Sequence, residues 1–164
     1  MDEPRIIAAE TPDQLAEAAR LFRDYAAAIG IDLEFQGFSD ELAALPGDYA
    51  PPRGVILLAL DGDRALGCVA LRPLEAEICE MKRMFVAPEG RGRQLGRRLA
   101  EAVIDKARQL GYRSMRLDTL KSMTVARELY RSLGFVPIAP YCHNPLPEPE
   151  FYQLDLTPST PTED

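Results

Sequence analysis

The segment from Glu80 to Leu99 constrains the fold more than any other part of this chain. It reads E-M-K-R-M-F-V-A-P-E-G-R-G-R-Q-L-G-R-R-L. The apolar run Met84–Val86 predicts the end of a strand, Pro88 interrupts it, and a helical pattern begins after Gly92. The first turn of a helix has unpaired N–H groups and a partial positive charge, so it attracts anions. Glycines let the backbone approach such a ligand closely. The segment therefore predicts a pyrophosphate-binding turn between a strand and a helix.

Basic charge is concentrated around this turn. The whole chain has a formal net charge of −7, but residues 82–98 hold six basic side chains and one acidic side chain, a local charge of +5. The rest of the chain therefore carries −12. An acidic protein has no general affinity for nucleic acids or anionic membranes, so we expect neither as a partner. The basic cluster indicates either a specific anionic ligand or a solvated helix face with ordinary surface arginines.

The length of 164 residues predicts one domain, which we place at residues 1–156, followed by a polar tail at residues 157–164 that we expect to be flexible. No apolar run approaches the ~20 residues that span a bilayer, and the N-terminus lacks the apolar core of a signal peptide. The three cysteines, Cys68, Cys79 and Cys142, fit neither a metal-binding spacing nor a disulfide framework. These features predict a cytoplasmic location and no bound metal.

Hydrophobic periodicity predicts an α/β fold of the mixed α+β kind. A capping box between Thr11 and Gln14 begins a helix that ends at Gly30, and Ser39 is expected to cap a short second helix. Three consecutive strands form an antiparallel meander, and a right-handed helical crossover leads to a parallel strand. The predicted strands are 5–9, 54–60, 65–72, 78–86, 114–119, 135–138 and 151–156, and the predicted helices are 12–29, 39–45, the glycine-rich turn to 110, and 122–133.

Glycine spacing excludes two widespread phosphate-binding loops. The dinucleotide-binding pattern G-x-G-x-x-G and the NTP-binding pattern G-x-x-x-x-G-K-[ST], each started at Gly90, both need glycine at position 95. This chain has Leu95 there, and no Lys-Ser or Lys-Thr pair follows at the required spacing. The turn therefore belongs to another kind of phosphate-binding loop.

The pattern Arg91-Gly92-Arg93-Gln94-Leu95-Gly96 resembles the acyl-CoA loop of the GNAT superfamily of N-acetyltransferases, Gln/Arg-x-x-Gly-x-Gly/Ala. Gln94 stands where that family usually has glycine, and we expect it to keep an ordinary negative φ. The segment Ala126–Phe135 (A-R-E-L-Y-R-S-L-G-F) is similar to the family's A-x-x-L-Y-x-x-x-G-F, although Met123 occupies a position where asparagine is common. The order of predicted elements also resembles that of the family over residues 5–156.

This resemblance implies a central, mostly antiparallel mixed sheet of about seven strands, flanked by about four helices. It also implies that acetyl-CoA lies in a cleft between the splayed fourth and fifth strands. Backbone groups of Met84, Phe85 and Val86 would hold the pantetheine arm and polarise the thioester carbonyl. The pyrophosphate would bind to the loop, whose implied cofactor-binding residues are Arg91, Gly92, Arg93, Gln94, Leu95 and Gly96.

Two residues are candidates for proton transfer. By resemblance, Tyr130 matches the position from which GNAT enzymes protonate the leaving thiolate, although its apolar helix face also fits a core tyrosine. Glu80 is the first candidate for the base that takes a proton from the amine, because it lies on the third meander strand near the splay. The alternative is a surface or salt-bridged Glu80 beside Lys82.

Four further residues are candidates for contact with the acceptor substrate. Phe35 fits either a pocket wall or the core, and His143 fits either a second base or an exposed loop position. Either Arg83 or Lys82 on the third meander strand could hold a substrate carboxylate, although strand alternation puts the two on opposite faces. The loop between the last two strands lines the acceptor cleft in this fold. The complete set is Arg83, Phe35, Tyr141 and His143.

Together these features predict an acetyl-CoA-dependent N-acetyltransferase that acts on the primary amine of a small molecule or an amino-acid-like substrate by direct attack on the thioester. Three alternatives stay open. They are a protein or peptide amine as the acceptor, a non-catalytic acyl-CoA-binding module, and a nucleotide-phosphate binder that uses the same loop. Exposed sheet edges in this fold often pair, so a homodimer is also expected.

Overall fold

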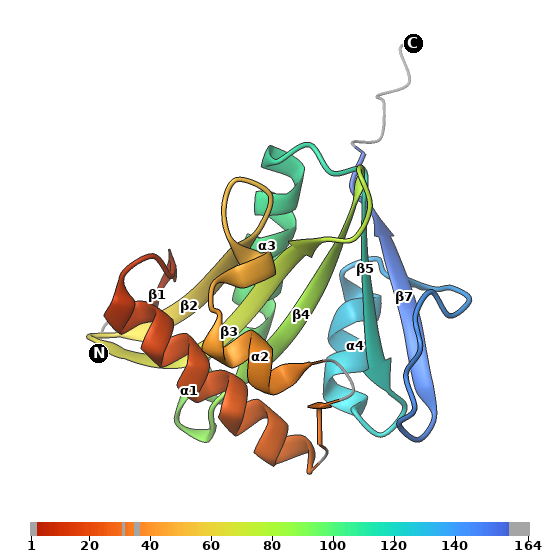
Figure 1. Ribbon diagram of the computed structural model, residues 1–164. Coiled ribbons are helices and arrows are strands. Elements are labelled where there is room, and N and C mark those ends of the chain that lie inside the picture. The colour runs from red at the N-terminus through yellow and green to blue at the C-terminus, as the bar shows by residue number, and fades with distance from the viewer. Residues whose placement is uncertain (1–2, 31, 35–36, 158–164) are drawn as a thin grey trace.

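A seven-stranded sheet forms the centre of the computed structural model, which describes residues 3–30, 32–34 and 37–157 (Figure 1). The strand order is β1-β2-β3-β4-β5-β7-β6. Every pair of neighbours is antiparallel except β4 and β5, which are parallel. The strands are β1 (Arg5–Ala8), β2 (Val55–Asp61), β3 (Arg64–Pro73), β4 (Ile78–Val86), β5 (Ser114–Leu120), β6 (Val136–Pro137) and β7 (Pro149–Asp155). The predicted mixed sheet is therefore confirmed.

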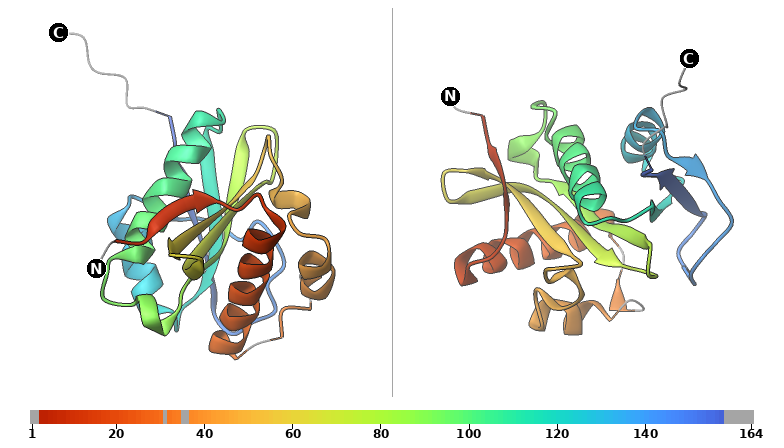
Figure 2. Two further views of the ribbon diagram at one scale, coloured as in Figure 1. Left: turned by 90° about the vertical axis from the view of Figure 1, so that its left-hand side faces the viewer. Right: turned by 90° about the horizontal axis from the view of Figure 1, so that it is seen from above.

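Helices cover both faces of the sheet, as Figure 2 shows. They are α1 (Pro12–Ile29), α2 (Phe38–Ala43), α3 (Leu95–Gln109) and α4 (Thr124–Ser132), with short 3₁₀ turns η2 (Gly47–Tyr49) and η3 (Pro88–Gly90). The cluster of buried residues under α1 and α2 includes Ile56 and Leu58, whereas the cluster under α3 and α4 includes Leu57. Alternate residues of one strand thus serve two cores, which is why β2 reads as a continuous apolar run.

Most of the predicted helix boundaries are confirmed to within a few residues. Thr11 and Gln14 form the predicted capping box, and Gly30 ends α1 with a φ of 68°. The cap of α2 differs from the prediction, because Gly37 precedes the helix with a φ of 70° and Ser39 lies inside it. The Ser39 hydroxyl and N–H both donate to Glu34 instead. Of the tail predicted at 157–164, all but Thr157 lies outside the described residues.

The parallel pairing of β4 and β5 is short. Only Ile78, Cys79 and Glu80 of β4 have partners on β5, which are Ser114, Met115 and Arg116. Beyond these pairs β4 continues beside β3, and β5 continues beside β7. The two strands therefore part, as Figure 1 shows, and leave an opening in the middle of the sheet.

A β-bulge in β4 turns a second side chain toward this opening. Cys68 of β3 pairs with Phe85 and Ala70 pairs with Lys82, so two residues of β4 oppose one of β3. Arg83 lies in the bulge with a φ of 61°. Strand alternation would put Lys82 and Arg83 on opposite faces, but both line the same cavity here because the bulge breaks the alternation.

The side chain of Arg83 is held by a buried ion pair with α2. Its Nε and Nη2 donate to the two carboxylate oxygens of Glu41, each at 2.9 Å. The Arg83 side chain is 2% exposed and that of Glu41 is 14% exposed. The guanidinium also lies 5.2 Å from the centre of the Phe38 ring. This pair joins α2 to the bulge.

Helix α3 begins with a residue in the left-handed conformation. Gln94 caps it with φ 60° and ψ 23°, and Gly92 two residues earlier has a φ of 83°. The expectation of a negative φ at Gln94 is therefore wrong. The turn requires the left-handed conformation at position 94, and a non-glycine residue adopts it there at a cost of ~1–2 kcal/mol.

We expect Glu41→Gln to lower the free energy of unfolding by ~3–5 kcal/mol, because it leaves the Arg83 charge buried without its anion. Urea denaturation measures this loss. Glu77→Gln is the control, since Glu77 meets Arg113 at 3.7 Å with both side chains about two-thirds exposed, and its effect is expected below ~1 kcal/mol. Equal effects of the two substitutions would contradict the structural role of the buried pair.

Substitutions of Gln94 test the left-handed turn. Gln94→Gly is expected to leave the free energy of unfolding unchanged or to raise it by up to ~1 kcal/mol, because glycine adopts this conformation without a steric penalty. Gln94→Val is expected to lower it by ~1–2 kcal/mol, because a β-branched residue is disfavoured at positive φ. Thermal and urea unfolding of the two variants measure the difference. A Gln94→Val protein as stable as Gln94→Gly would rule out this conformational constraint.

Candidate active site

A groove of about 960 Å³ runs along the end of β4, the turn before α3, and α4. The part of β4 that lines it follows the bulge, and α4 forms the opposite wall with Val125, Ala126 and Leu129. Of the nine residues predicted to bind the cofactor, the groove is lined by Met84, Phe85, Val86, Arg91, Gly92, Gln94, Leu95 and Gly96. Arg93 does not line it. The structure thus brings together the strand and loop parts of the prediction.

The N-terminus of α3 at this groove is built to receive an anion. No side chain caps it, and its first turn has no acidic residue. The first N–H groups of the helix therefore have no partner within the helix and carry partial positive charge. A Cβ at Gly96 would meet only Leu129 and Val86, at 3.7 and 3.9 Å. Packing alone does not demand glycine at position 96, and its absent side chain widens the groove.

The basic cluster divides between several places. Arg91 and Arg97 line the groove, and Arg97 donates to Ser132 Oγ through Nη2 at 2.6 Å. Arg98 points elsewhere, because its Nη2 donates to the carbonyl of Pro4 at 2.9 Å. Lys82 and Arg83 line a separate inner cavity. The local charge of +5 is therefore not one surface patch.

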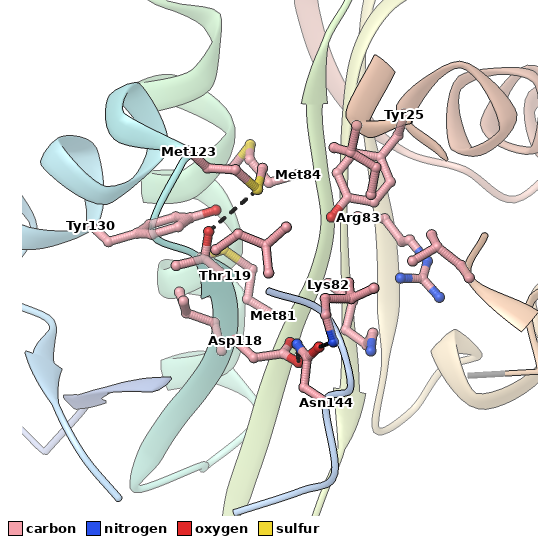
Figure 3. A pocket seen from close by; sticks show the side chains of 15 residues that line it. Tyr25, Met81, Lys82, Arg83, Met84, Asp118, Thr119, Met123, Tyr130 and Asn144 are labelled. Atoms are coloured by element: carbon pink, nitrogen blue, oxygen red, sulfur yellow. Dashed lines mark hydrogen bonds between the residues drawn. The ribbon is translucent and has the colours of Figure 1, made fainter. Parts of the chain in front are cut away.

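The inner cavity lies in the opening between β4 and β5, with about 40 Å³ of space (Figure 3). It adjoins the groove, since Tyr25, Ile29, Met84 and Met123 line both. Its polar lining comes from both separated strands and from the loop before β7. These side chains are Lys82, Arg83, Asp118, Thr119 and Asn144, together with the phenols of Tyr25 and Tyr130.

Tyr130 reaches this cavity from α4. Its ring packs against Phe135, with 5.7 Å between ring centres, and Figure 3 shows its hydroxyl directed toward Thr119 and Met123. Burial, with a smaller contribution from Asp118, raises the pKa of Tyr130 above its usual value. The residue is thus both part of the core and a protonated hydroxyl in the lining of the inner cavity.

Glu80 lies behind the cavity wall. The residue is 2% exposed and does not line the cavity. Its Oε1 accepts from Arg72 Nε at 2.8 Å, and its Oε2 accepts from the Tyr141 hydroxyl at 2.7 Å. The salt-bridged alternative is thus realised, although with Arg72 as the partner. A proton from the cavity would reach Glu80 only through Tyr141 or a water molecule.

The loop between β6 and β7 closes one side of the cavity. Asn144 Nδ2 donates to Asp118 Oδ2 at 3.0 Å, while Tyr141 is held by Glu80. The Cys142 thiol faces Asp118, and burial raises its pKa to about 11, so it is not a ready nucleophile. His143 is exposed and lines neither space. Phe35 lies outside the described residues.

Of the charged residues of the cavity, Asp118 was not predicted, and Lys82 was predicted only as the alternative to Arg83 for a substrate carboxylate. Asp118 continues the polar, half-buried side of β5 after Ser114 and Arg116, and Lys82 stands on the last regular part of β4. Burial lowers the pKa of the Lys82 ammonium, whereas the nearby carboxylates of Glu80 and Asp118 act to raise it. A charged residue on a buried strand is the signal that identifies both positions.

Within the described ranges, no group of three His, Cys, Asp or Glu side chains could hold a metal ion. No helix among them is long and apolar enough to cross a membrane.

Comparison with known proteins agrees with the geometry. The acetyltransferase (GNAT) family matches residues 7–135. An uncharacterized N-acetyltransferase of Schizosaccharomyces pombe is 42% identical over 154 residues, which cover 93% of this chain and 94% of that protein. A GNAT acetyltransferase of Staphylococcus aureus superposes with a TM-score of 0.77 at 22% identity, over 93% of this chain and 99% of that one.

A further solved structure contains the expected ligand. An acetyltransferase of Salmonella typhimurium, with its cofactor acetyl-CoA, has a TM-score of 0.72 at 19% identity and covers 99% of both chains. That likeness extends to the fold, and the family match and the yeast relative extend to the sequence. The chain therefore belongs to the GNAT family and is an N-acetyltransferase.

Proposed function

We propose that this protein transfers an acetyl group from acetyl-CoA to the primary amine of a small molecule or an amino-acid-like compound. The observation that carries the proposal is that the groove and the inner cavity adjoin along shared lining residues. The groove holds the anion-binding turn, the cavity holds the proton-carrying side chains, and Met84 lines both. If the thioester of acetyl-CoA lies near Met84, the phosphates of the cofactor lie in the groove and the acceptor amine lies in the cavity.

The cofactor is held mainly by backbone groups. The N–H groups at the start of α3 take the pyrophosphate, with Arg91 and Arg97 adding charge-assisted hydrogen bonds. The pantetheine arm follows Met84–Val86, where β4 has left β5 and its backbone groups face the opening. A β4 N–H directed at the thioester oxygen acts as an oxyanion donor, a role that contributes ~3–4 kcal/mol in other enzymes.

The reaction is a direct acyl transfer. The amine nitrogen attacks the thioester carbonyl carbon, the C–N bond forms, and the C–S bond breaks as the tetrahedral intermediate collapses. One amine proton leaves to a base, and the sulfur departs as a thiolate that takes a proton from Tyr130 or from solvent. Since lysine-like amines have a pKa of ~10.4, the acceptor arrives mostly as an ammonium ion and must also lose that proton.

Asp118 is better placed than Glu80 to receive the acceptor. Asp118 lines the cavity, whereas both oxygens of Glu80 are bonded to Arg72 and Tyr141. A general base must lie within hydrogen-bond reach of the proton, directly or through one water. We therefore assign contact with the amine to Asp118. Glu80 acts through Tyr141, as a support of the loop or as the end of a proton path.

Tyr130 is the proposed proton donor to the leaving sulfur. Its raised pKa keeps the hydroxyl protonated through the neutral and mildly alkaline range. We expect Tyr130→Phe to lower kcat by up to about a hundredfold, the low end for general-acid effects, because a thiolate of pKa ~8.5 leaves readily.

Thiol release from acetyl-CoA, measured against a broad panel of amines from pH 6 to 10, tests this role. Because the pKa is raised, wild-type kcat should show no falling limb from Tyr130 in this range. An unchanged kcat in Tyr130→Phe would reduce Tyr130 to a core residue. Acetyl-CoA binding without thiol release by any amine would support a non-catalytic acyl-CoA-binding module instead.

Matched carboxylate-to-amide substitutions distinguish the two candidate bases. We expect Asp118→Asn to lower kcat/KM by about a hundredfold or more, since it removes the charge that meets the amine. Glu80→Gln should lower the free energy of unfolding, because it weakens the bond to Arg72, while kcat changes by less than about tenfold. Steady-state kinetics and urea unfolding of both variants make the comparison. The reverse order of kinetic effects would assign the base to Glu80 through Tyr141.

A further inference from the structure

We propose that the acceptor is a small zwitterion, an amino acid in the chemical sense, whose ammonium group meets Asp118 and whose carboxylate meets Lys82. This inference rests on the proposed acyl transfer and specifies its substrate class. It follows from the positions of the charged residues around the inner cavity and from their partners.

Lys82 and Asp118 are counterparts across the opening. Glu80 and Arg116 are the last paired residues of β4 and β5, and Lys82 and Asp118 each lie two residues further along. Residues two apart on a strand point to the same face. Parallel strands that had stayed together would therefore place these two side chains beside each other. The strands part instead, and Figure 3 shows both side chains directed into the space between them.

Two charged groups near the cavity, those of Arg83 and Glu80, are held by side chains outside it. Among the described residues that line it, the charged ones are Lys82, Arg83 and Asp118. The Arg83 guanidinium makes its bidentate pair with Glu41. The Glu80 carboxylate, just behind the wall, is divided between Arg72 and Tyr141. Asp118 also accepts from Asn144, and it faces Lys82 across the cavity, so the lining presents one cation and one anion to a ligand.

The charges around the cavity balance without a ligand. Three cations and three anions make up the set Lys82, Arg83, Arg72, Asp118, Glu41 and Glu80. Tyr25, Tyr130, Tyr141 and Cys142 have raised pKa values and remain neutral. A simple ammonium ion would add an uncompensated charge in a poorly hydrated place, which is costly. A zwitterion adds no net charge. Its ammonium group pairs with Asp118 and its carboxylate with Lys82, in place of part of the attraction between these two side chains.

Space limits the acceptor to a small molecule. The cavity holds about 40 Å³, and the loop of Tyr141 and Asn144 closes its side away from the groove. The acceptor must also reach the thioester near Met84, which lies two residues beyond Lys82 on β4.

The test compares acceptors that differ only in the carboxylate. L-amino acids and β-alanine are each paired with their carboxamide, and transfer is followed by thiol release. For the acids that are used, we expect kcat/KM to exceed that of the amide by about tenfold to a hundredfold, the effect of one charge-assisted hydrogen bond. The primary amine of the carboxamide is less basic than that of the free acid, so a larger share of it is unprotonated and ready to react. This difference by itself favours the carboxamide, so a preference for the acid reports recognition of the carboxylate.

Variants assign the preference to Lys82. Lys82→Met should raise KM for the acid by about tenfold or more while KM for the amide changes by less than about threefold. Lys82→Arg should restore part of the preference, because it keeps the charge. Lys106→Met is the matched control, since Lys106 lies in the last turn of α3, away from the cavity, and it should leave the preference unchanged.

Binding separates failure of this inference from failure of the proposed function. Each acid and amide is added to the coenzyme A complex, and the shift in melting temperature is recorded. Stabilisation by acids but not by amides, lost in Lys82→Met, supports the zwitterion site even where no acetyl transfer is seen. Transfer to amines with no difference between acid and amide overturns the inference and leaves the acetyltransferase proposal intact. Absence of stabilisation and of transfer by every acid in the panel also overturns it.

Discussion

The site depends on the point at which β4 and β5 stop pairing. The two strands share three residue pairs and then separate. Had they stayed paired, the backbone N–H and C=O groups beyond Glu80 would form hydrogen bonds between the two strands, as in any sheet. The separation leaves those of β4 facing an opening, where they are available to an extended ligand. The groove, the cavity and the arrangement of charges all follow from this parting.

Buried charges hold the parted strands in place. A buried ion needs a partner, and in the described part of the chain no fully buried side-chain nitrogen or oxygen lacks one. Arg83 ties the bulge of β4 to α2, Glu80 ties the start of the opening to β3 and to the loop, and Asp118 ties β5 to Asn144. Except for the bond between Glu80 and Arg72, each of these contacts joins residues at least 26 positions apart. Together they make the opening a defined cavity instead of a defect that closes by collapse.

Local physics explains which parts of this arrangement could be predicted. The helix ends at Thr11 and Gly30 and the apolar strands depend on residues close in sequence, so periodicity and capping rules located them. The order of the elements, together with the turn before α3, then led to the family. Gln94 was misjudged because propensity favours glycine at positive φ, and the turn overrode it. Arg83 was selected for a substrate, but its pair with Glu41 spans 42 residues and leaves no local signal.

The placement of α3 shows how packing and ligand binding use glycine differently. A Cβ at Gly90 would lie 2.9 Å from the end of the Leu95 side chain, which would have to shift, and 3.1 Å from the Leu66 carbonyl, which is tighter than most real contacts. Glycine there favours the packing of the protein itself, because it leaves room for the buried Leu95 in the first turn of α3. At Gly96 a Cβ would make only ordinary contacts. Gly90 therefore helps to set the position of the helix N-terminus, and Gly96 leaves the approach to it open. A phosphate-binding turn needs both properties, because partial charges act strongly on an anion only when they are held rigidly and can be reached closely.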